Sequence, residues 1–346
     1  MQISTEVQGQ SAPAFGRGRM TELLDSLMTG NRRALSRAIT LIESTRPDHR
    51  EQAVELLSQL PPRQALRIGM SGTPGVGKST FIEAFGTMLT EQGHRVAVLA
   101  VDPSSARSGG SILGDKTRMD LLSRNPMAFI RPTPSSAELG GVARRTRESI
   151  RLCEAAGYDV VLIETVGVGQ SETLVAEMSD LFILLLAPAG GDELQGVKRG
   201  IMEMADLVLV NKADGDLLAT ARRTCADYAG ALRLLRKRPQ DPERFPKALT
   251  VSAATGDGLR KAWDEMQQLA DWRRENGHFE TTRSTQARHW FMAELRAGLL
   301  ARLDQPEIKA ELQQLGEAVA AGDMTPGLAA MRMLDHLNKG QGGFRE

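Results

Sequence analysis

The sequence of 346 residues predicts a doubly wound α/β fold with a mainly parallel sheet, an N-terminal helical extension and a C-terminal helical arm. Short apolar, β-branched runs recur through the middle of the chain, and helical stretches separate most of them. Such runs, without polar alternation, are typical of a parallel sheet covered on both faces. After about residue 280 apolar residues follow helical spacing instead. We therefore expect a disordered leader over 1–19, the extension over 20–62, the α/β domain over 63–272 and the arm over 273–346.

The individual elements follow from local patterns. In the extension, Leu35 and Ile39 stand at helical spacing, and Pro47 predicts the start of a further helix. In the arm, Pro306 and Pro326 stand at expected helix starts. The runs that predict strands are Ile68–Met70, Val96–Val101, Ala128–Ile130, Val160–Ile163, Leu181–Leu186, Leu207–Val210 and Leu249–Val251.

A phosphate-binding loop follows the first predicted strand, because the segment fits the pattern GxxxxGK[ST] and a helix is expected directly after it. Backbone N–H groups must converge on phosphate oxygens, which requires glycine where a side chain would obstruct the approach. Lys78 is expected to reach the β- and γ-phosphates of a nucleoside triphosphate, and the Ser79 hydroxyl to ligate Mg²⁺. The residues predicted to contact the nucleotide are Gly72, Thr73, Pro74, Gly75, Val76, Gly77, Lys78, Ser79 and Thr80.

A second motif predicts guanine as the base, because an NKxD tetrapeptide directly follows a predicted strand. The carboxylate of Asp214 can accept hydrogen bonds from guanine N1–H and the 2-amino group, and adenine offers neither donor there. Lys212 can lay its aliphatic stem along the purine face. A backbone N–H at 252–254 can meet guanine O6. The residues predicted to bind the base are Asn211, Lys212, Asp214, Ser252, Ala253 and Ala254.

Three residues are candidates for catalysis, namely Lys78, Glu164 and Asp102, and the two acids are also candidate magnesium ligands beside Ser79. Glu164 ends a buried strand, where its carboxylate can hold Mg²⁺ directly or through a water. Asp102 closes an earlier strand before a Gly- and Ser-rich stretch that suits a switch loop, with a turn cap as the alternative. Gly167 is expected to bring its N–H to the γ-phosphate.

The sequence predicts weak intrinsic hydrolysis that a partner accelerates, because no Gln directly follows Gly167 to orient a water. Gln170 lies three positions further on. The arginines that could stabilise charge in the transition state are Arg107, Arg118, Arg144, Arg145 and Arg199, and the pattern does not choose among them.

Composition excludes other classes of function. The chain has 43 Lys plus Arg and 43 Asp plus Glu, so it lacks the basic excess of proteins that bind nucleic acid or anionic membranes. The run Leu181–Ala187 is far shorter than the roughly 20 residues that span a bilayer. The chain has two cysteines, Cys153 and Cys225, which cannot build a disulfide framework. This low cysteine content favours a reducing compartment, most simply the cytoplasm. We expect no nucleic-acid or membrane partner.

Together with the two nucleotide motifs, the longer segments Val101–Ser105, Ser108–Met119 and Glu164–Glu172 resemble the MeaB/ArgK G proteins, a family of P-loop GTPases. The resemblance covers roughly residues 20–340. It implies a homodimeric GTPase chaperone, dimerised through the arm, of methylmalonyl-CoA mutase or a related coenzyme B12-dependent mutase. It further implies that such a protein gates adenosylcobalamin loading and protects the mutase from inactivation.

A polar, glycine-rich loop, Gly190–Gly200, follows the strand predicted at 181–186. It lies at the carboxyl edge of a parallel strand, where ligands gather in such sheets. The resemblance implies an additional switch there that contacts the mutase, with Asp192, Glu193 and Lys198 as its candidate residues. An ordinary solvated connection is the alternative.

Two other functions stay open beside the chaperone. One is a GTPase of metallocentre assembly, although the five histidines are scattered and form no clustered tract. The other is a kinase or ATPase linked to transport, as older descriptions of the family have it, although no HRD or DFG set of a protein kinase is present.

Overall fold

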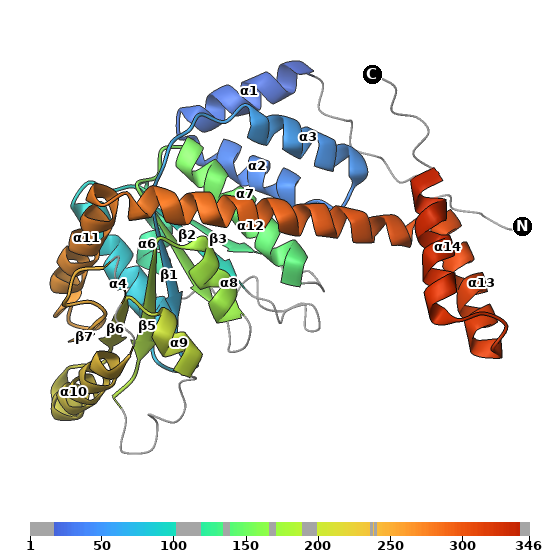
Figure 1. The fold of residues 1–346 in the computed structure, drawn as a ribbon. Coiled ribbons are helices and arrows are strands. Elements are labelled where there is room, and N and C mark those ends of the chain that lie inside the picture. The colour runs from blue at the N-terminus through green and yellow to red at the C-terminus, as the bar shows by residue number, and fades with distance from the viewer. Residues whose placement is uncertain are drawn as a thin grey trace, which may run out of the picture. The chain divides into compact units, whose positions relative to one another are not determined.

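The structure is a computed structural model that describes residues 17–101, 119–133, 139–165, 171–188, 199–235, 238 and 241–339 (Figure 1). The chain divides into two compact units, Met1–Gln286 and Ala287–Glu346. Within the described ranges no helix is both long and apolar enough to cross a membrane. This division into two units rests on contacts and does not test the four zones that the sequence pattern predicts, which therefore stay a prediction.

A sheet of seven parallel strands forms the centre of the first unit, in the order β3-β2-β4-β1-β5-β6-β7. The strand order turns at β1, which lies between β4 and β5, and ligands of doubly wound sheets bind at such a point, beyond the carboxyl ends of the strands. The doubly wound parallel sheet predicted from the sequence is therefore confirmed. The strands are β1 (Leu66–Ser71), β2 (Val96–Val101), β3 (Ala128–Thr133), β4 (Val160–Thr165), β5 (Leu181–Leu186), β6 (Leu207–Val210) and β7 (Lys247–Thr250).

The bounds of four strands differ from the prediction. Strands β1, β3 and β4 extend beyond the predicted runs Ile68–Met70, Ala128–Ile130 and Val160–Ile163. The last strand was expected at Leu249–Val251, but it begins at Lys247 and ends at Thr250. The error has a physical cause, because β7 is an edge strand whose four residues are all half-buried, and such a strand does not need an unbroken apolar run. By contrast, every residue of β1, β2, β4, β5 and β6 is buried.

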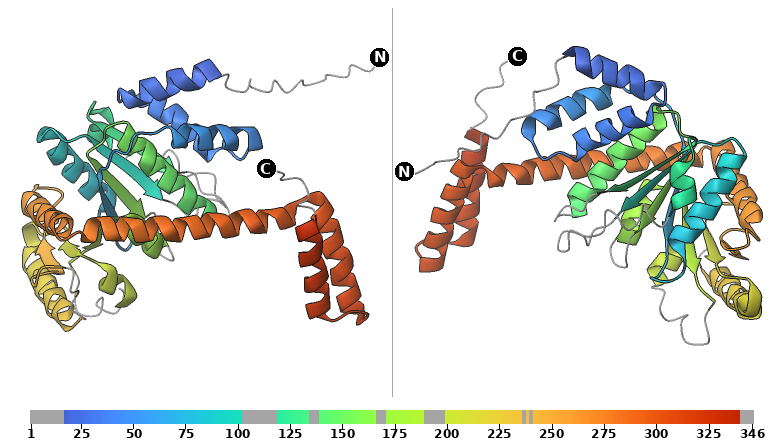
Figure 2. Two further views of the ribbon diagram at one scale, coloured as in Figure 1. Left: turned by 45° about the horizontal axis from the view of Figure 1, so that its top comes forward. Right: turned by 180° about the vertical axis from the view of Figure 1, so that it is seen from behind.

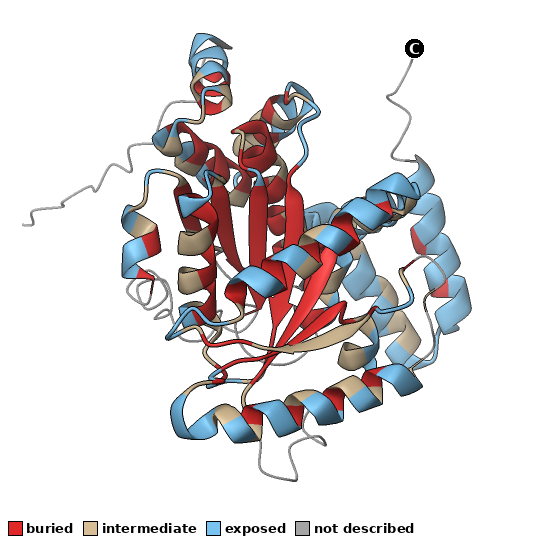
Figure 3. Cartoon of the chain, turned by 90° about the vertical axis from the view of Figure 1, so that its left-hand side faces the viewer, coloured by how far each residue is buried: buried red, intermediate tan, exposed pale blue. Residues whose placement is uncertain are grey.

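Helices cover both faces of the sheet, with α4, α6 and α11 on one face and α7 and α8 on the other (Figure 1). Most of the sheet between the helices is buried (Figure 3). Phe81 and Phe85 of α4 are fully buried, with ring centroids 5.3 Å apart, and Trp263 of α11 packs edge-on against Phe85 at 5.9 Å. The helices of the α/β domain are α4 (Lys78–Glu91), α6 (Asp120–Arg124), α7 (Leu139–Ala155), α8 (Ser171–Met178), α9 (Arg199–Met204), the 3₁₀ turn η3 (Gly215–Leu217), α10 (Leu218–Leu234) and α11 (Leu259–Glu275).

The N-terminal extension is helical, as predicted, and consists of α1 (Arg17–Met28), α2 (Arg32–Glu43) and α3 (Pro47–Ser58). Asn31 caps α2 by accepting from two backbone N–H groups at 2.9 and 3.1 Å. All three helices contact α7 (Figure 2). Ion pairs between Arg131 and Glu43, and between Arg50 and Glu148, also join the extension to the α/β domain.

The C-terminal region is also helical, as predicted. Helix α12 (His278–Ala301) follows α11 and is followed by the turn η4 (Arg302–Asp304). In the second unit, α13 (Pro306–Ala321) packs against α14 (Pro326–Lys339), with Ile308, Ala329 and Met333 buried. Both helices begin at the prolines that predicted their starts.

Candidate nucleotide-binding site

The phosphate-binding loop connects β1 to α4 at the carboxyl edge of the sheet. Gly72 lies so close to β5 that a Cβ there would be 2.3 Å from the carbonyl oxygen of Leu185. Gly77, with φ 87°, turns the chain into the first residue of α4. The loop therefore directs the N-terminus of α4, with its free N–H groups, at the space where phosphates are predicted to bind.

Lys78 lies against the loop, and its Nζ donates to the carbonyl oxygens of Gly72 at 2.6 Å and Thr73 at 3.4 Å. Burial lowers the pKa of Lys78, while the negative charges of Glu164 and Glu172 counteract this by raising it. A triphosphate beside Lys78 would add further negative charge and favour the ammonium form.

The end of β4 lies beside the loop as predicted, because Glu164 pairs in register with Met70 of β1. The carboxylate of Glu164 belongs to a residue that is only 2% exposed. The next residue, Thr165, donates its hydroxyl to Ser71 at 3.2 Å, which joins the ends of the two strands. Glu164 therefore lies near the end of the strand adjacent to the phosphate loop, the position for which the sequence predicts a magnesium ligand.

Glu172, for which the sequence pattern predicts no role, lies near Lys78 in the structure. Glu172 is 3% exposed and lies in the first turn of α8. The sequence contained one signal for it, an acidic residue at the start of a helix that follows the segment after β4. Two buried carboxylates therefore share the surroundings of a single lysine.

Asn211 connects the phosphate loop to the guanine-binding loop. Its amide donates to the carbonyl oxygen of Val76 at 3.0 Å, and its side-chain oxygen accepts from the N–H of Ala253 at 3.1 Å. Lys212 extends toward the same loop and donates to the carbonyl oxygen of Gly75 at 2.8 Å. The NKxD segment, the loop after β7 and the phosphate loop are therefore one hydrogen-bonded structure.

The carboxylate predicted to recognise guanine is held in place by a serine. The buried Ser252 hydroxyl donates to Oδ2 of Asp214, and Ser252 Oγ also accepts from the N–H of Thr255 at 3.1 Å. Asp214 itself is half-buried, so the residue is partly accessible. Ala254 is exposed beside it.

The structure brings together the predicted residues of the phosphate loop, the NKxD motif, the 252–254 loop and Glu164. Arg144 and Arg145 lie on α7, and nothing in their placement selects either for catalysis. Arg199 is the first residue of α9. The remaining predicted residues lie outside the described residues, and they are Asp102, Arg107, Arg118, Gly167, Gln170, Asp192, Glu193 and Lys198.

Replacing Gly77 by Ala is expected to weaken GDP and GTP binding about tenfold or more. The left-handed φ of 87° costs about 1–2 kcal/mol for alanine. In addition, the new Cβ would lie 2.9 Å from Nδ2 of Asn211, so the amide that joins the two loops must move. The measurement is a titration with fluorescent GDP, accompanied by thermal unfolding.

The matched control is Gly93→Ala. Gly93 has φ 88°, and a Cβ there meets no atom within 4 Å, so this variant has the backbone cost alone. Similar destabilisation of both variants with a loss of GDP affinity only in Gly77→Ala is the expected pattern. Equal GDP affinities would show that the contact with Asn211 is unimportant.

A parallel α/β sheet with a phosphate loop at its strand-order turn and an NKxD segment at the end of β6, hydrogen-bonded to that loop, defines a guanine-nucleotide-binding protein of the P-loop class. Comparison with known proteins places the chain within this class. The family model described as methylmalonyl-CoA mutase-associated GTPase MeaB matches residues 35–307, and the chain belongs to the MeaB family.

Individual relatives agree with this assignment. The mouse protein named methylmalonic aciduria type A homolog, mitochondrial, is 50% identical over 325 residues, which are 90% of this chain and 78% of the mouse protein. The GTPase ArgK of Escherichia coli is 46% identical over 82% of this chain and 86% of its own. A crystal structure of an LAO/AO transport system kinase superposes with a TM-score of 0.71 and 36% identity, and it covers 93% of this chain and 99% of its own. The chain is therefore a GTPase that binds guanine nucleotides.

Proposed function

We propose that the chain is a GTP-hydrolysing chaperone that gates adenosylcobalamin loading into methylmalonyl-CoA mutase, or a related B12-dependent acyl-CoA mutase, and protects that enzyme from inactivation. The observation that carries the proposal is the hydrogen-bonded nucleotide site in a chain whose family model is described as mutase-associated. A site of this kind changes the contacts of nearby loops when the γ-phosphate is lost, which is the basis of GTPase switches.

The site fits a magnesium ion, since Ser79 and Glu164 offer the hydroxyl and carboxylate oxygens that Mg²⁺ prefers. Bound there, Mg²⁺ would neutralise charge on the β- and γ-phosphates. Lys78 would move from the loop carbonyls onto the phosphates, and Asp214 would hold the base. With no Gln directly after Gly167, we propose slow hydrolysis by the isolated chain, which single-turnover measurements with GTP would contradict if they showed fast hydrolysis.

The test of the chaperone proposal combines a pull-down with a GTPase assay, using methylmalonyl-CoA mutase as the partner. We expect binding in at least one nucleotide state and a several-fold stimulation of GTP hydrolysis. Lys198→Ala, in the proposed partner switch, is expected to reduce stimulation while GDP affinity is unchanged. An absence of binding in both nucleotide states would contradict the chaperone role and leave a GTPase with a different partner.

We also propose that the chain forms a homodimer through its C-terminal helices. Phe291, Leu295 and Leu299 recur every four residues along one stripe of α12, and their exposed fractions are 65%, 45% and 53%. On α14, Met331 and Leu334 are 56% and 60% exposed. Large apolar side chains that gather on exposed helical surfaces mark interaction sites, and a second copy of the chain offers the same surfaces.

The double substitution Leu295→Glu and Leu299→Glu is expected to convert the dimer to a monomer with an intact nucleotide site. Light scattering measures the mass, and a GDP titration checks the site. Arg296→Glu, at an exposed polar position between them, is the control and should stay dimeric. A wild-type chain that is monomeric at all concentrations would exclude the proposal.

A further inference from the structure

The last strand of the sheet, β7, has one edge that no described strand pairs with. Within the described part of the chain it pairs with β6 alone, and its four residues are half-buried, whereas those of β6 are fully buried. The opposite edge strand, β3, contains Pro132, which lacks an N–H and so protects that edge against pairing. Within β7 there is no proline, and Pro246 stands just before the strand.

The hydrogen bonds of β7 show which backbone groups face outward. The N–H groups of Lys247 and Val251 donate to β6 and its flank, at 3.3 Å to Asp206 and 2.8 Å to Val210. Alternate residues of a parallel strand point their backbone groups to opposite sides. Ala248 therefore points its N–H and C=O away from β6, toward the unpaired edge.

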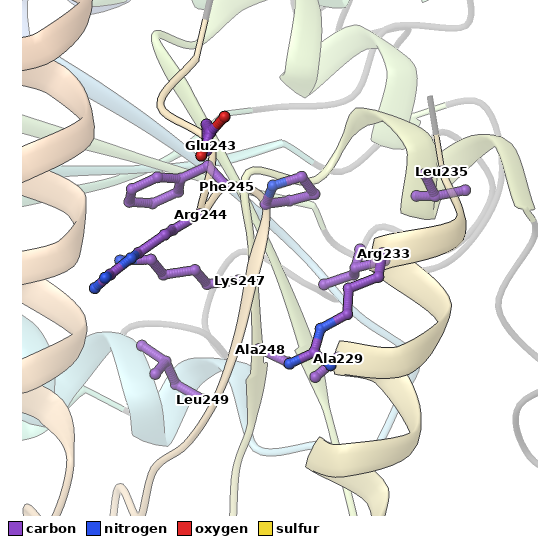
Figure 4. Close-up of a pocket in the computed structure, with 11 residues that line it drawn as sticks. Ala229, Arg233, Leu235, Glu243, Arg244, Phe245, Lys247, Ala248 and Leu249 are labelled. Carbon is purple, nitrogen blue, oxygen red and sulfur yellow. The ribbon is translucent and has the colours of Figure 1, made fainter. Parts of the chain in front are cut away.

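A groove of about 590 Å³ runs along this edge. Ala229, Leu232 and Leu235 of the α10 segment, with Phe245 and Leu249, give it apolar walls. Figure 4 shows Arg244, Lys247 and Leu249 extending to one side of the strand, and Arg233 of α10 on the other side. The unpaired backbone thus lies between two rows of side chains.

The groove is basic on both sides of the strand. Arg233 and Arg244 are exposed, while Lys247 pairs with Glu265, and Glu243 is the acidic side chain in the lining. The two exposed arginines of the lining therefore outnumber Glu243, and the groove has an excess of positive charge.

We propose that the β7 edge is a docking site for a short, extended acidic segment of another protein, which adds to the sheet as an eighth strand. The backbone of the segment would pair with Ala248, and its alternate side chains would point to the two sides of the sheet. On each side of the sheet an acidic side chain of the segment would lie near an exposed arginine, which is Arg233 on one side and Arg244 on the other. Apolar side chains of the segment would pack against the groove walls.

The acidic charge required of the docked segment also indicates that it belongs to another protein. The chain's own terminal segments do not have the required chemistry, since residues 1–16 contain one acidic residue and residues 340–346 contain one acidic and one basic residue. The strand continues directly into Val251 and Ser252, so the docked segment would lie beside the loop that holds Asp214.

The test uses the full chain and a fluorescein-labelled hexapeptide of alternating Glu and Val, followed by fluorescence anisotropy at low ionic strength. The acidic peptide is expected to bind, and a hexapeptide of alternating Lys and Val is not. Arg233→Glu combined with Arg244→Glu should weaken binding tenfold or more. The control, Arg19→Glu with Arg33→Glu, makes the same change in net charge at exposed positions of α1 and α2 and should bind like the wild type.

Ala248→Pro tests strand addition separately from charge. The substitution removes the outward N–H but no backbone hydrogen bond to β6. GDP affinity should therefore be retained, and binding of the acidic peptide should be lost. Wild-type peptide affinity in Ala248→Pro, or in the Arg233 and Arg244 double variant, would overturn the proposal. The proposal would also be overturned if the chain did not bind the acidic peptide but bound a single-stranded oligonucleotide or anionic vesicles through the same arginines.

Discussion

Asp214→Asn is expected to lower the affinity for GDP and GTP by roughly 100-fold or more, because two hydrogen bonds to a charged acceptor are lost. In the wild type one carboxylate accepts from both the N1–H and the 2-amino group of guanine. An asparagine amide turned toward the base would instead oppose one donor with another. Ser252 fixes the orientation of the side chain at this position, so the substituted amide cannot simply turn away without losing that contact.

The same substitution should improve binding of xanthosine diphosphate, since xanthine has a carbonyl where guanine has its amino group and an asparagine N–H can donate to it. Competition titrations with GDP and xanthosine diphosphate measure both effects. Asp216→Asn is the matched control, because Asp216 is exposed two residues further along. If Asp214→Asn kept wild-type affinity for GDP, Asp214 would not be the residue that recognises guanine.

Arg273→Met is expected to destabilise the fold by about 3 kcal/mol or more, because it leaves buried carboxylates without their main partner. Arg273 is 7% exposed and forms hydrogen bonds to Asp241 at 2.8 Å and to Asp206 at 2.6 Å. It also donates to the backbone oxygen of Asp180 at 2.7 Å. Burial alone would lower the pKa of Arg273, but Asp206 and Asp241 outweigh it and raise that pKa.

Urea unfolding measures this loss, with Arg260→Met as the control on the same helix. Arg260 pairs with Asp264, but both side chains are more than half exposed, so we expect a change of less than about 1 kcal/mol. The cluster around Arg273 joins α11 to the segments that precede β5 and β6, at the end of the sheet away from the phosphate loop. Near-equal stabilities of the two variants would show that Arg238, which also pairs with Asp206, compensates for the loss.

Strand bounds were predictable from the sequence where a buried strand is apolar throughout, as in Val96–Val101, Leu181–Leu186 and Leu207–Val210. The fully buried strands β1 and β4 were predicted too short, because Arg67, Ser71 and the pair Glu164–Thr165 interrupt or end their apolar runs. At β7 an apolar run is not required, since Lys247 points its amine to Glu265 while its backbone pairs with β6. A polar residue at such an edge carries no strand signal, and the predicted boundary was therefore wrong.

The candidate site was predictable where its chemistry is local. The phosphate loop and the NKxD segment are contiguous, so residue type and spacing alone indicate them. The function of Asn211 as a connection between Val76 and Ala253 is not local, since these residues are 135 and 42 positions away from it. The proximity of Glu172 to Lys78 and the cluster around Arg273 also depend on the folded sheet, and no short pattern indicates them.

The central claim, that this chain turns over guanine and not adenine nucleotides at the loop around Lys78, is tested most directly by phosphate release. The purified chain is supplied with Mg²⁺ and either GTP or ATP, and Lys78→Ala serves as the blank. We expect measurable GTP turnover that excess GDP suppresses and excess ADP does not, and ATP turnover no higher than the blank. ATP turnover equal to that of GTP, or GTP turnover that survives in Lys78→Ala, would contradict the account.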